Sequence, residues 1–274
     1  MSDVSALSKT RASAASPTVV SFCSVEYLDI LTLWLERFRR ASTAPLVIYA
    51  FDDATDARCR ALGIHSHTVS APQSRGDLWL ARVDAFLALT RAGTDFIHCD
   101  LDALWRCDLS EYLRDHLDAC DLAFSLGTHW PRDVWAKWGF VLCAGVFQSR
   151  ASAATESFWQ AVRERTSAYG DDQVAISRLL SEHLDAWADP ADCLELVDST
   201  RNIRCRYPRD PLVRTIAPTG LRVGIIPHHV CSRLTHVERG TCIDHPLAPK
   251  DHHAKLSLLH SLINGTDGPL LRSR

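Results

Sequence analysis

Two aspartates, Asp100 and Asp102, stand one residue apart directly after an apolar run, Phe96-Ile97-His98-Cys99. Leu104-Trp105 resumes the apolar pattern, so the pair falls where a buried strand is expected to end. Both carboxylates can reach one divalent cation, because hard cations prefer oxygen ligands and often bridge protein carboxylates to phosphates. Aspartates that bond to the backbone of a turn would explain the same pattern without a ligand, so both interpretations stay open here.

A second polar group, Gly170-Asp171-Asp172-Gln173, stands directly before the apolar run Val174-Ala175-Ile176. Aspartate is among the best residues for capping the N-terminus of a helix, which is a sufficient structural reason for Asp171 or Asp172. An Asp-Gln pair at a helix start can also hold sugar hydroxyls or lie beside a reacting carbon. Asp172 and Gln173 are therefore candidate catalytic residues, beside the capping interpretation.

The histidines are unevenly placed, since seven of thirteen fall between His228 and His260. Zinc accepts histidine and cysteine ligands, but the spacings match no standard zinc finger or ribbon. A simpler hypothesis is that one histidine joins the two aspartates around a divalent cation. Lys255, one of only four lysines, can neutralise a phosphate, or it can be an ordinary solvated surface residue.

Three tryptophans, Trp130, Trp135 and Trp138, fall within nine residues. Their rings can stack on a sugar or another flat ligand, and equally they can fill a core or a lid without any ligand. Both interpretations are kept.

The composition excludes several classes of protein. With 46% hydrophobic residues and a net charge of −3 over 274 residues, the chain is neither globally disordered nor a basic nucleic-acid binder. No stretch reaches the about 18 uncharged apolar residues of a membrane span, and residues 1–17 lack the apolar core of a signal peptide. We therefore predict a cytoplasmic protein whose ten cysteines are buried free thiols.

Glycine is scarce, and its spacing is informative. The twelve glycines form no G-x-G pair and no G-x-x-x-x-G-K motif, so the usual glycine-rich phosphate cradles are absent. A bound phosphate must then be held by side chains or by a metal.

The apolar pattern alternates between strands and helices. Short apolar runs predict strands, and apolar residues three and four apart predict helices. Such alternation is typical of βαβ units in one largely parallel sheet, whose ligands bind at the carboxyl ends of the strands. We expect one domain after a mobile tail at 1–17, with a less regular segment over 198–226. The expected strands are 19–23, 46–51, 95–99, 122–125 and 140–147, and the expected helices are 25–38, a short one after Asp53, 79–92, 152–167 and 172–184.

The order of these features resembles the nucleotide-diphospho-sugar transferase family, whose members are D-x-D glycosyltransferases of the GT-A fold. The resemblance runs from about Thr18 to about Leu262. Its parts are, in chain order, Ser21 to Trp34, Val47 to Asp52, Arg82 in the helix before the metal strand, His98 to Trp105, Asp121 to Ser125, Ala144 to Phe147, the Asp172-Gln173 pair, His245 and Lys255.

The resemblance implies an α/β, Rossmann-like fold with a mostly parallel mixed sheet flanked by helices. It implies a single domain over 18–262 and a C-terminal tail over 263–274. It further implies a metal-dependent glycosyltransferase that moves a sugar from a nucleotide-diphosphate sugar, in particular a UDP-sugar, with retention at the anomeric carbon. The acceptor stays open among a glycan, a lipid-linked sugar, a small molecule and a protein.

The resemblance also assigns residues to the metal and the diphosphate. Asp102 and His245 would hold Mn²⁺ or Mg²⁺, with Asp100 reaching the metal or the ribose. Lys255 and the metal would neutralise the departing diphosphate, which replaces the missing glycine cradle.

The resemblance also assigns residues to the donor sugar and to the base of the nucleotide. Arg82, Asp172 and Gln173 would lie beside the donor sugar as catalytic residues, and Phe22 or Tyr27 would contact the base.

Three positions depart from the family pattern. Arg82 stands where the family usually has lysine, Cys143 stands where an asparagine is frequent, and Pro246 follows His245 where an asparagine is frequent. The alternatives kept open are His252 or His253 as the metal ligand and Lys250 in place of Lys255.

Two other functions remain as alternatives. A metal-dependent hydrolase of a phosphoester or nucleotide-sugar can use the same Asp/His set to activate water, with Asp172 as its general base. A non-catalytic glycan-binding module can use the segment from Trp130 to Trp138.

Overall fold

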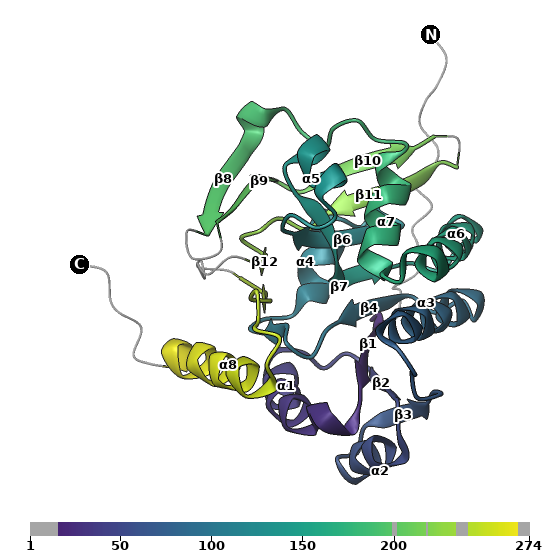
Figure 1. The fold of residues 1–274 in the computed structure, drawn as a ribbon, viewed down its shortest axis with the longest axis vertical. Coiled ribbons are helices and arrows are strands. Elements are labelled where there is room, and N and C mark those ends of the chain that lie inside the picture. Colours follow the sequence, from purple (N-terminus) through teal and green to yellow (C-terminus); the bar gives the residue numbers. More distant parts are fainter. Residues whose placement is uncertain (1–15, 199–201, 218, 234–240, 268–274) are drawn as a thin grey trace.

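Eight strands of four to nine residues, most of them apolar, build one mixed sheet in the order β10-β11-β6-β7-β4-β1-β2-β3 (Figure 1). The computed structural model describes residues 16–198, 202–217, 219–233 and 241–267. The strands of the sheet are β1 (Thr18–Cys23), β2 (Leu46–Ala50), β3 (His65–Thr68), β4 (Phe96–Cys99), β6 (Leu122–Gly127), β7 (Val141–Ser149), β10 (Leu212–Ile216) and β11 (Leu221–Ile225).

The strand directions decide where a ligand can bind. Strands β3, β2, β1 and β4 are parallel neighbours, and β6 and β11 run the same way, whereas β7 and β10 run opposite to them. The carboxyl ends of β1, β2 and β4 therefore meet at one edge of the sheet. The predicted α/β fold with a mostly parallel mixed sheet flanked by helices is confirmed.

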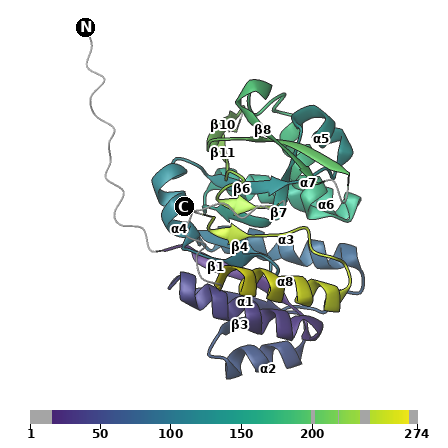
Figure 2. The ribbon, with the colours of Figure 1, turned by 90° about the vertical axis from the view of Figure 1, so that its left-hand side faces the viewer.

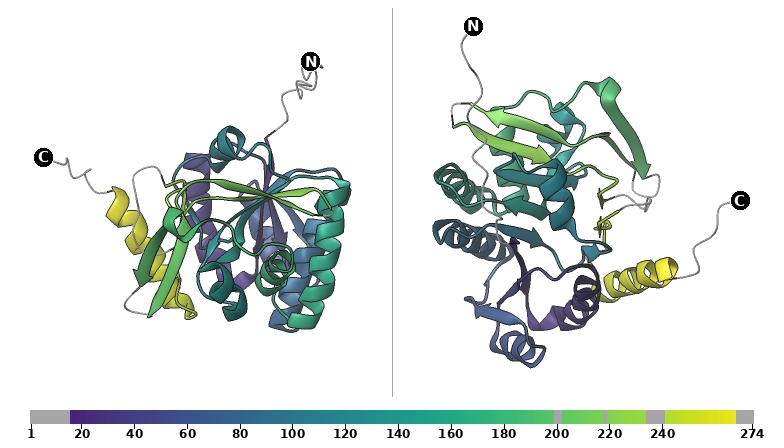
Figure 3. Two further views of the ribbon diagram at one scale, coloured as in Figure 1. Left: turned by 90° about the horizontal axis from the view of Figure 1, so that it is seen from above. Right: turned by 180° about the vertical axis from the view of Figure 1, so that it is seen from behind.

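Helices cover both faces of the sheet and enclose two hydrophobic clusters. On one face α3, α6 and α7 bury residues such as Phe86, Trp159 and Ile176, and on the other α1, α2, α4 and α8 bury residues such as Trp34 and Leu113. Figure 1 shows α3 and α6 to the right of the strands and α1 and α8 to the left, and Figure 3 (right) shows the same division from behind. The helices are α1 (Leu28–Ala41), α2 (Asp53–Ala61), α3 (Arg75–Arg91), α4 (Leu109–His116), α5 (Arg132–Trp138), α6 (Ala153–Tyr169), α7 (Asp172–Ser181) and α8 (His252–Asp267), with short 3₁₀ turns at Val25–Tyr27 and Pro190–Asp192.

The last helix lies against the first one, as Figure 2 shows. Leu259 of α8 is fully buried in the same cluster as the inner face of α1, and His252 bonds to Asp29 of α1 at 2.9 Å. Helix α8 continues to Asp267, five residues into the segment predicted as a tail. Of the predicted tails at 1–17 and 263–274, residues 1–15 and 268–274 lie outside the described residues, so the division into domain and tails stays a prediction.

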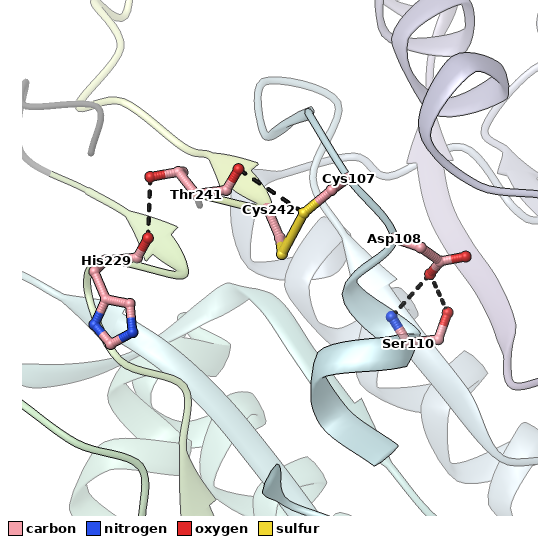
Figure 4. Close-up of a disulfide and its surroundings, with 6 residues drawn as sticks. All are labelled: Cys107, Asp108, Ser110, His229, Thr241 and Cys242. Atoms are coloured by element: carbon pink, nitrogen blue, oxygen red, sulfur yellow. Dashed lines mark hydrogen bonds between the residues drawn. A yellow bond between two sulfur atoms is a disulfide. The ribbon is translucent and has the colours of Figure 1, made fainter. Parts of the chain in front are cut away.

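A small sheet ties distant parts of the chain together. Its strands are β12 (Cys231–Ser232), β13 (Ile243–Asp244) and β5 (Leu104–Trp105), in the order β12-β13-β5. A disulfide joins Cys107 to Cys242 next to this sheet, across a sequence separation of 135 residues (Figure 4). The prediction of ten free thiols is wrong for this pair, because strand pairing brings two cysteines together that no local spacing connects. The other eight are free.

The segment over 198–226 is more regular than predicted. It contains β9 (Ile203–Pro208), which pairs with β8 (Cys193–Asp198), and it supplies β10 and β11 to the main sheet. The β8–β9 pair projects at the upper left in Figure 1. In β9 the alternate residues Arg204 and Arg206 are exposed and charged, so no continuous apolar run marks this strand in the sequence.

In the described part of the chain, no helix combines the length and the apolar character that crossing a bilayer requires.

Candidate active site

The turn after β4 carries the two aspartates, and a separate strand carries the histidine. The backbone N–H of Asp100 donates to the carbonyl of Gly145 on the neighbouring strand at 2.7 Å, which fixes where the turn begins. His245 follows β13, whose pairing with β5 brings it back to the turn. The Nε2 of His245 lies 3.3 Å from Asp102 Oδ1 and 4.0 Å from Asp100 Oδ2.

These three side chains fit a divalent cation. One ligand atom from each of Asp100, Asp102 and His245 lies within 4.8 Å of the others. Two carboxylates and an imidazole suit Mn²⁺ or Mg²⁺, with positions left for phosphate or water oxygens. Gly145 faces the group, and a Cβ there would overlap both Asp100 Oδ2 and His245 Cε1. The glycine therefore keeps the space between the ligands open, and the assignment of the metal stays a prediction.

Lys255 lies at the same group. Its Nζ donates to Asp102 Oδ2 at 3.0 Å, and the ammonium stands over the ring of Tyr27 at 5.3 Å. Burial raises the pKa of Asp102, but His245 and Lys255 outweigh it and hold that pKa well below its usual range. Asp102 is therefore ionised and ready to ligate a cation.

Arg82 connects the metal group to the Asp172-Gln173 pair. It is buried on the inner face of α3, where NH1 lies 3.2 Å from Asp100 Oδ1, Nε lies 3.3 Å from Asp172 Oδ2, and NH2 donates to the carbonyl of Ala144. Burial raises the pKa of Asp172 to about 6, against the opposing effect of Arg82. One guanidinium thus fixes two carboxylates that enter the site from different elements.

His98 belongs to this network although sequence reasoning did not select it. It is fully buried in β4, its Nδ1 lies 3.2 Å from the carbonyl of Val20, and Arg82 NH2 donates to its Nε2 at 2.9 Å. Burial, followed by the charge of Arg82, lowers the pKa of His98 to about 4, so the ring is neutral. A histidine in an apolar strand carries no local signal of such a role, because only the fold brings Arg82 to it.

Two adjoining cavities flank the metal group and share Trp79, Arg82 and Asp100 in their walls. The first measures about 270 Å³, and Phe22, Tyr27 and Lys255 line it. The second measures about 260 Å³, and its lining includes Cys143, Gly145, Asp172, Gln173, Arg233 and His245. Each is at the small end for a ligand pocket, and together they have room for a two-part ligand.

The remaining predicted residues divide between these cavities. Phe22 stacks on Tyr49 at 5.0 Å and presents its ring to the first cavity, beside Tyr27. Gln173 lines the second cavity, and its Nε2 donates to the carbonyl of Trp130 at 2.8 Å. Asp171 caps α7 by accepting from the Val174 N–H, so the capping interpretation applies to Asp171 while Asp172 faces Arg82.

The alternatives to His245 and Lys255 lie elsewhere. His252 bonds to Asp29 and packs edge-on against Tyr27, and His253 and Lys250 are exposed. Among the described residues, the metal group is formed by Asp100, Asp102 and His245.

The three clustered tryptophans take different positions. Trp138 is buried and its Nε1 donates to the Leu184 carbonyl, Trp135 donates to the Arg204 carbonyl, and Trp130 is 55% exposed at the rim of the second cavity. The segment therefore serves both the core and the site.

Comparison with known families decides the affiliation. The sequence model of the nucleotide-diphospho-sugar transferase family matches residues 42–245, which include Arg82, both aspartates, the Asp172-Gln173 pair and His245. The chain belongs to this family. The match confirms the predicted resemblance, and the transferase class of the chain rests on this family membership. Comparison with curated protein sequences gives no match.

Solved structures similar to this family member share little sequence with it. The glycosyltransferase GlyE of Streptococcus pneumoniae TIGR4 is 14% identical over 65% of this chain and 47% of that chain, with a TM-score of 0.46. The galactosyltransferase LgtC is 14% identical over 59% and 70%, and mouse xyloside xylosyltransferase 1 is 13% identical over 61% and 82%, each with a TM-score of 0.43. The chain thus spans about half the length of GlyE.

Proposed function

We propose that this transferase moves a sugar from a nucleotide-diphosphate sugar, in particular a UDP-sugar, to an acceptor with the help of Mn²⁺ or Mg²⁺ and with retention at the anomeric carbon. The observation that supports it most is the Asp100–Asp102–His245 group, whose three residues lie within the family match. The group stands between two cavities and has Lys255 beside it.

The charges suit a diphosphate at the boundary of the cavities. When bound, a divalent cation supplies Lewis-acid stabilisation of the charge on the departing diphosphate. Lys255, released from Asp102 to phosphate oxygens, adds a positive charge on the side of the first cavity. The glycine cradle that the sequence lacks is not needed in this arrangement.

The two cavities suit the two ends of such a donor. Phe22 and Tyr27 offer flat rings to the base in the first cavity. In the second, Arg82 holds Asp172 and Asp100 in fixed positions, and Gln173 has an amide oxygen free to accept from sugar hydroxyls. These residues contribute to transfer by binding the sugar in one orientation beside Asp172.

A cytoplasmic location is part of the proposal, and one observation opposes it. The Cys107–Cys242 disulfide is of a kind that persists mainly in oxidising compartments. Fractionation of the source cells followed by thiol labelling of the native protein would decide the location.

Titration calorimetry of UDP with and without Mn²⁺ tests the function. We expect Mn²⁺-dependent binding that Asp102→Ala weakens at least about tenfold, because the variant removes one of three metal ligands. Asp115→Ala, which removes an exposed carboxylate on α4, is the matched control and should bind as wild type. Equal UDP affinity without metal would contradict the metal assignment.

Product analysis separates transfer from the two alternative functions. We expect a nucleotide-sugar to be consumed faster when a suitable acceptor is present. If free sugar is released at the same rate with and without acceptors, the hydrolase is favoured. If the protein binds glycans without any turnover, the binding module is favoured.

A further inference from the structure

Two arginines in the wall of the second cavity lack the carboxylate partner that the third one has. Arg82 lies between Asp100 and Asp172 and is neutralised there. For Arg75 and Arg233, no carboxylate among the described residues comes within ion-pair distance. Arg75 begins α3 and stacks on Trp79 at 5.5 Å, at the exposed side of the cavity. Asp100, Asp171 and Asp172 also line this cavity, but neither Arg75 nor Arg233 forms an ion pair with them.

Arg233 is held rigidly at this place by the backbone. It follows β12, its N–H donates to His228 Nε2, and its NH1 donates to the carbonyls of His245 and Pro246 at 3.2 and 3.4 Å. Its Nε is buried and has no hydrogen-bond partner. A buried donor without a partner is costly, and a guanidinium fixed in this way is preorganised for an anion that enters from the cavity.

The other polar groups of this cavity do not form an ion pair with Arg233. Cys143 lines the cavity, and its Sγ lies 3.8 Å from His245 Nδ1. Among the described residues, the guanidinium of Arg233 is held by the carbonyls of His245 and Pro246 and not by a carboxylate.

The cavity that Arg233 lines is the one assigned to the sugar, not the one assigned to the base. Lys255 and Arg233 face different cavities, since Lys255 lines the one with Phe22 and Tyr27 and Arg233 lines the one with Asp172 and Gln173. An anion at Arg233 thus lies on the sugar side of the metal group, away from the proposed place of the base. A neutral sugar ring would leave Arg233 unpaired there.

We propose that the second cavity binds a sugar that carries a carboxylate, a uronosyl group, and that Arg233 grips this carboxylate with Arg75 at the rim. This rests on the proposed function, because the cavity is assigned to the donor sugar there. The planar guanidinium can offer two parallel N–H groups to the carboxylate oxygens, which favours a uronosyl donor over its neutral counterpart.

Calorimetry with matched donors in the presence of Mn²⁺ tests it. UDP-glucose and UDP-glucuronic acid differ only at C6, as do UDP-galactose and UDP-galacturonic acid. For the pair with the accepted ring configuration, wild type should bind the uronosyl donor at least about tenfold more tightly, a difference of about 1.4 kcal/mol. Arg233→Gln should abolish this preference, Arg233→Lys should keep part of it, and in Arg233→Gln the affinity for UDP alone should fall by less than the affinity for the uronosyl donor.

Arg114→Gln, which removes an exposed guanidinium from α4, is the control and should keep the preference. If wild type binds the neutral donor as tightly as the uronosyl donor in both pairs, the proposal is overturned, and no variant is needed to show it. Loss of UDP affinity in Arg233→Gln equal to the loss for uronosyl donors would also overturn it, because Arg233 would then bind the diphosphate. Absence of UDP binding to wild type with Mn²⁺ would instead overturn the proposed function itself.

Discussion

Asp172 combines deep burial with a carboxylate oxygen, Oδ2, that accepts no hydrogen bond from the described residues, although Arg82 Nε lies 3.3 Å from it as an ion-pair partner. Burial raises its pKa from 3.8 to about 6, so the folded state holds the proton more tightly than the unfolded state does. The free energy of unfolding should therefore fall as pH rises from about 4 to about 6, by up to about 3 kcal/mol for this group. Asp172 is maintained at the expense of stability, as is common for residues that serve a site.

Asp172→Asn tests this reasoning. The variant should be more stable than wild type at pH 8, and the difference should close below pH 4, while donor turnover is lost. Urea unfolding across this pH range measures it, with Asp53→Asn on the exposed side of α2 as the control. A variant less stable than wild type at pH 8 would show that the ion pair with Arg82 outweighs the cost of burial.

Gly145 has no side chain because the metal group occupies that space. Gly145→Ala places a methyl group against Asp100 Oδ2 and His245 Cε1, so we expect Mn²⁺ affinity to fall at least about tenfold. Gly76→Ala is the control, since a Cβ there would meet its nearest neighbours at 3.7 Å. Unchanged Mn²⁺ affinity, measured by the paramagnetic resonance of free Mn²⁺, would contradict the proposed ligand set.

The placement of single residues could be predicted from sequence where residue type and strand end coincide. Asp100 and Asp102 follow β4 directly, as the apolar run before them predicts, whereas their role as metal ligands stays a prediction. His98 and Arg233 gain their significance only from contacts across the sheet, with Arg82 and with the carbonyl of His245. Tertiary proximity of this kind has no local sequence signal.

At the scale of elements, the disulfide clamps the strand that precedes His245. Cys242 immediately precedes β13, and Cys107 follows β5. The two strands pair with each other, and an ion pair of 2.6 Å between Arg106 and Asp244 lies beside them. Closing a loop of 135 residues removes conformational freedom from the unfolded chain, worth about 4–5 kcal/mol in the loop-entropy account. The clamp therefore supports the approach of His245 to the aspartates.

Cys107→Ser should lower the free energy of unfolding by several kcal/mol and weaken Mn²⁺ binding. Guanidinium unfolding with and without dithiothreitol measures the first effect, and only wild type should respond to the reductant. Cys193→Ser, at a half-buried free cysteine, is the control. An equal response of Cys107→Ser to dithiothreitol would show that another thiol pair is the sensitive one.

The predictions of elements failed where polar residues carry the strand. β3 has the sequence HSHT at the sheet edge and is mostly exposed, so no apolar run marks it. The short helix predicted after Asp53 is present as α2, although it buries Thr55, Asp56 and Cys59 and not an apolar stripe. Continuous apolar strands such as β4 and β7, covered on both faces, were predictable for the opposite reason.

At the scale of the molecule, the two ends of the described chain build one side of the site. Helix α8 packs on α1, which brings Lys255 to Asp102 and to the ring of Tyr27 (Figure 2). The family match ends at residue 245, so the position of Lys255 depends on how this last helix docks. Docking, in turn, depends on few buried residues, of which Leu259 is fully enclosed.

Leu259→Ala should loosen α8 and weaken binding at a site that it does not touch. Truncating a buried leucine costs about 2–5 kcal/mol, and here the loss falls on the contact that positions Lys255. UDP affinity with Mn²⁺ should fall about as far as in Lys255→Met, whereas Ser257→Ala, on the exposed face of α8, should bind as wild type. If Leu259→Ala unfolds more easily yet keeps full UDP affinity while Lys255→Met loses it, the position of Lys255 does not depend on docking of the helix. If Lys255→Met keeps full affinity as well, the assignment of Lys255 to the diphosphate is wrong.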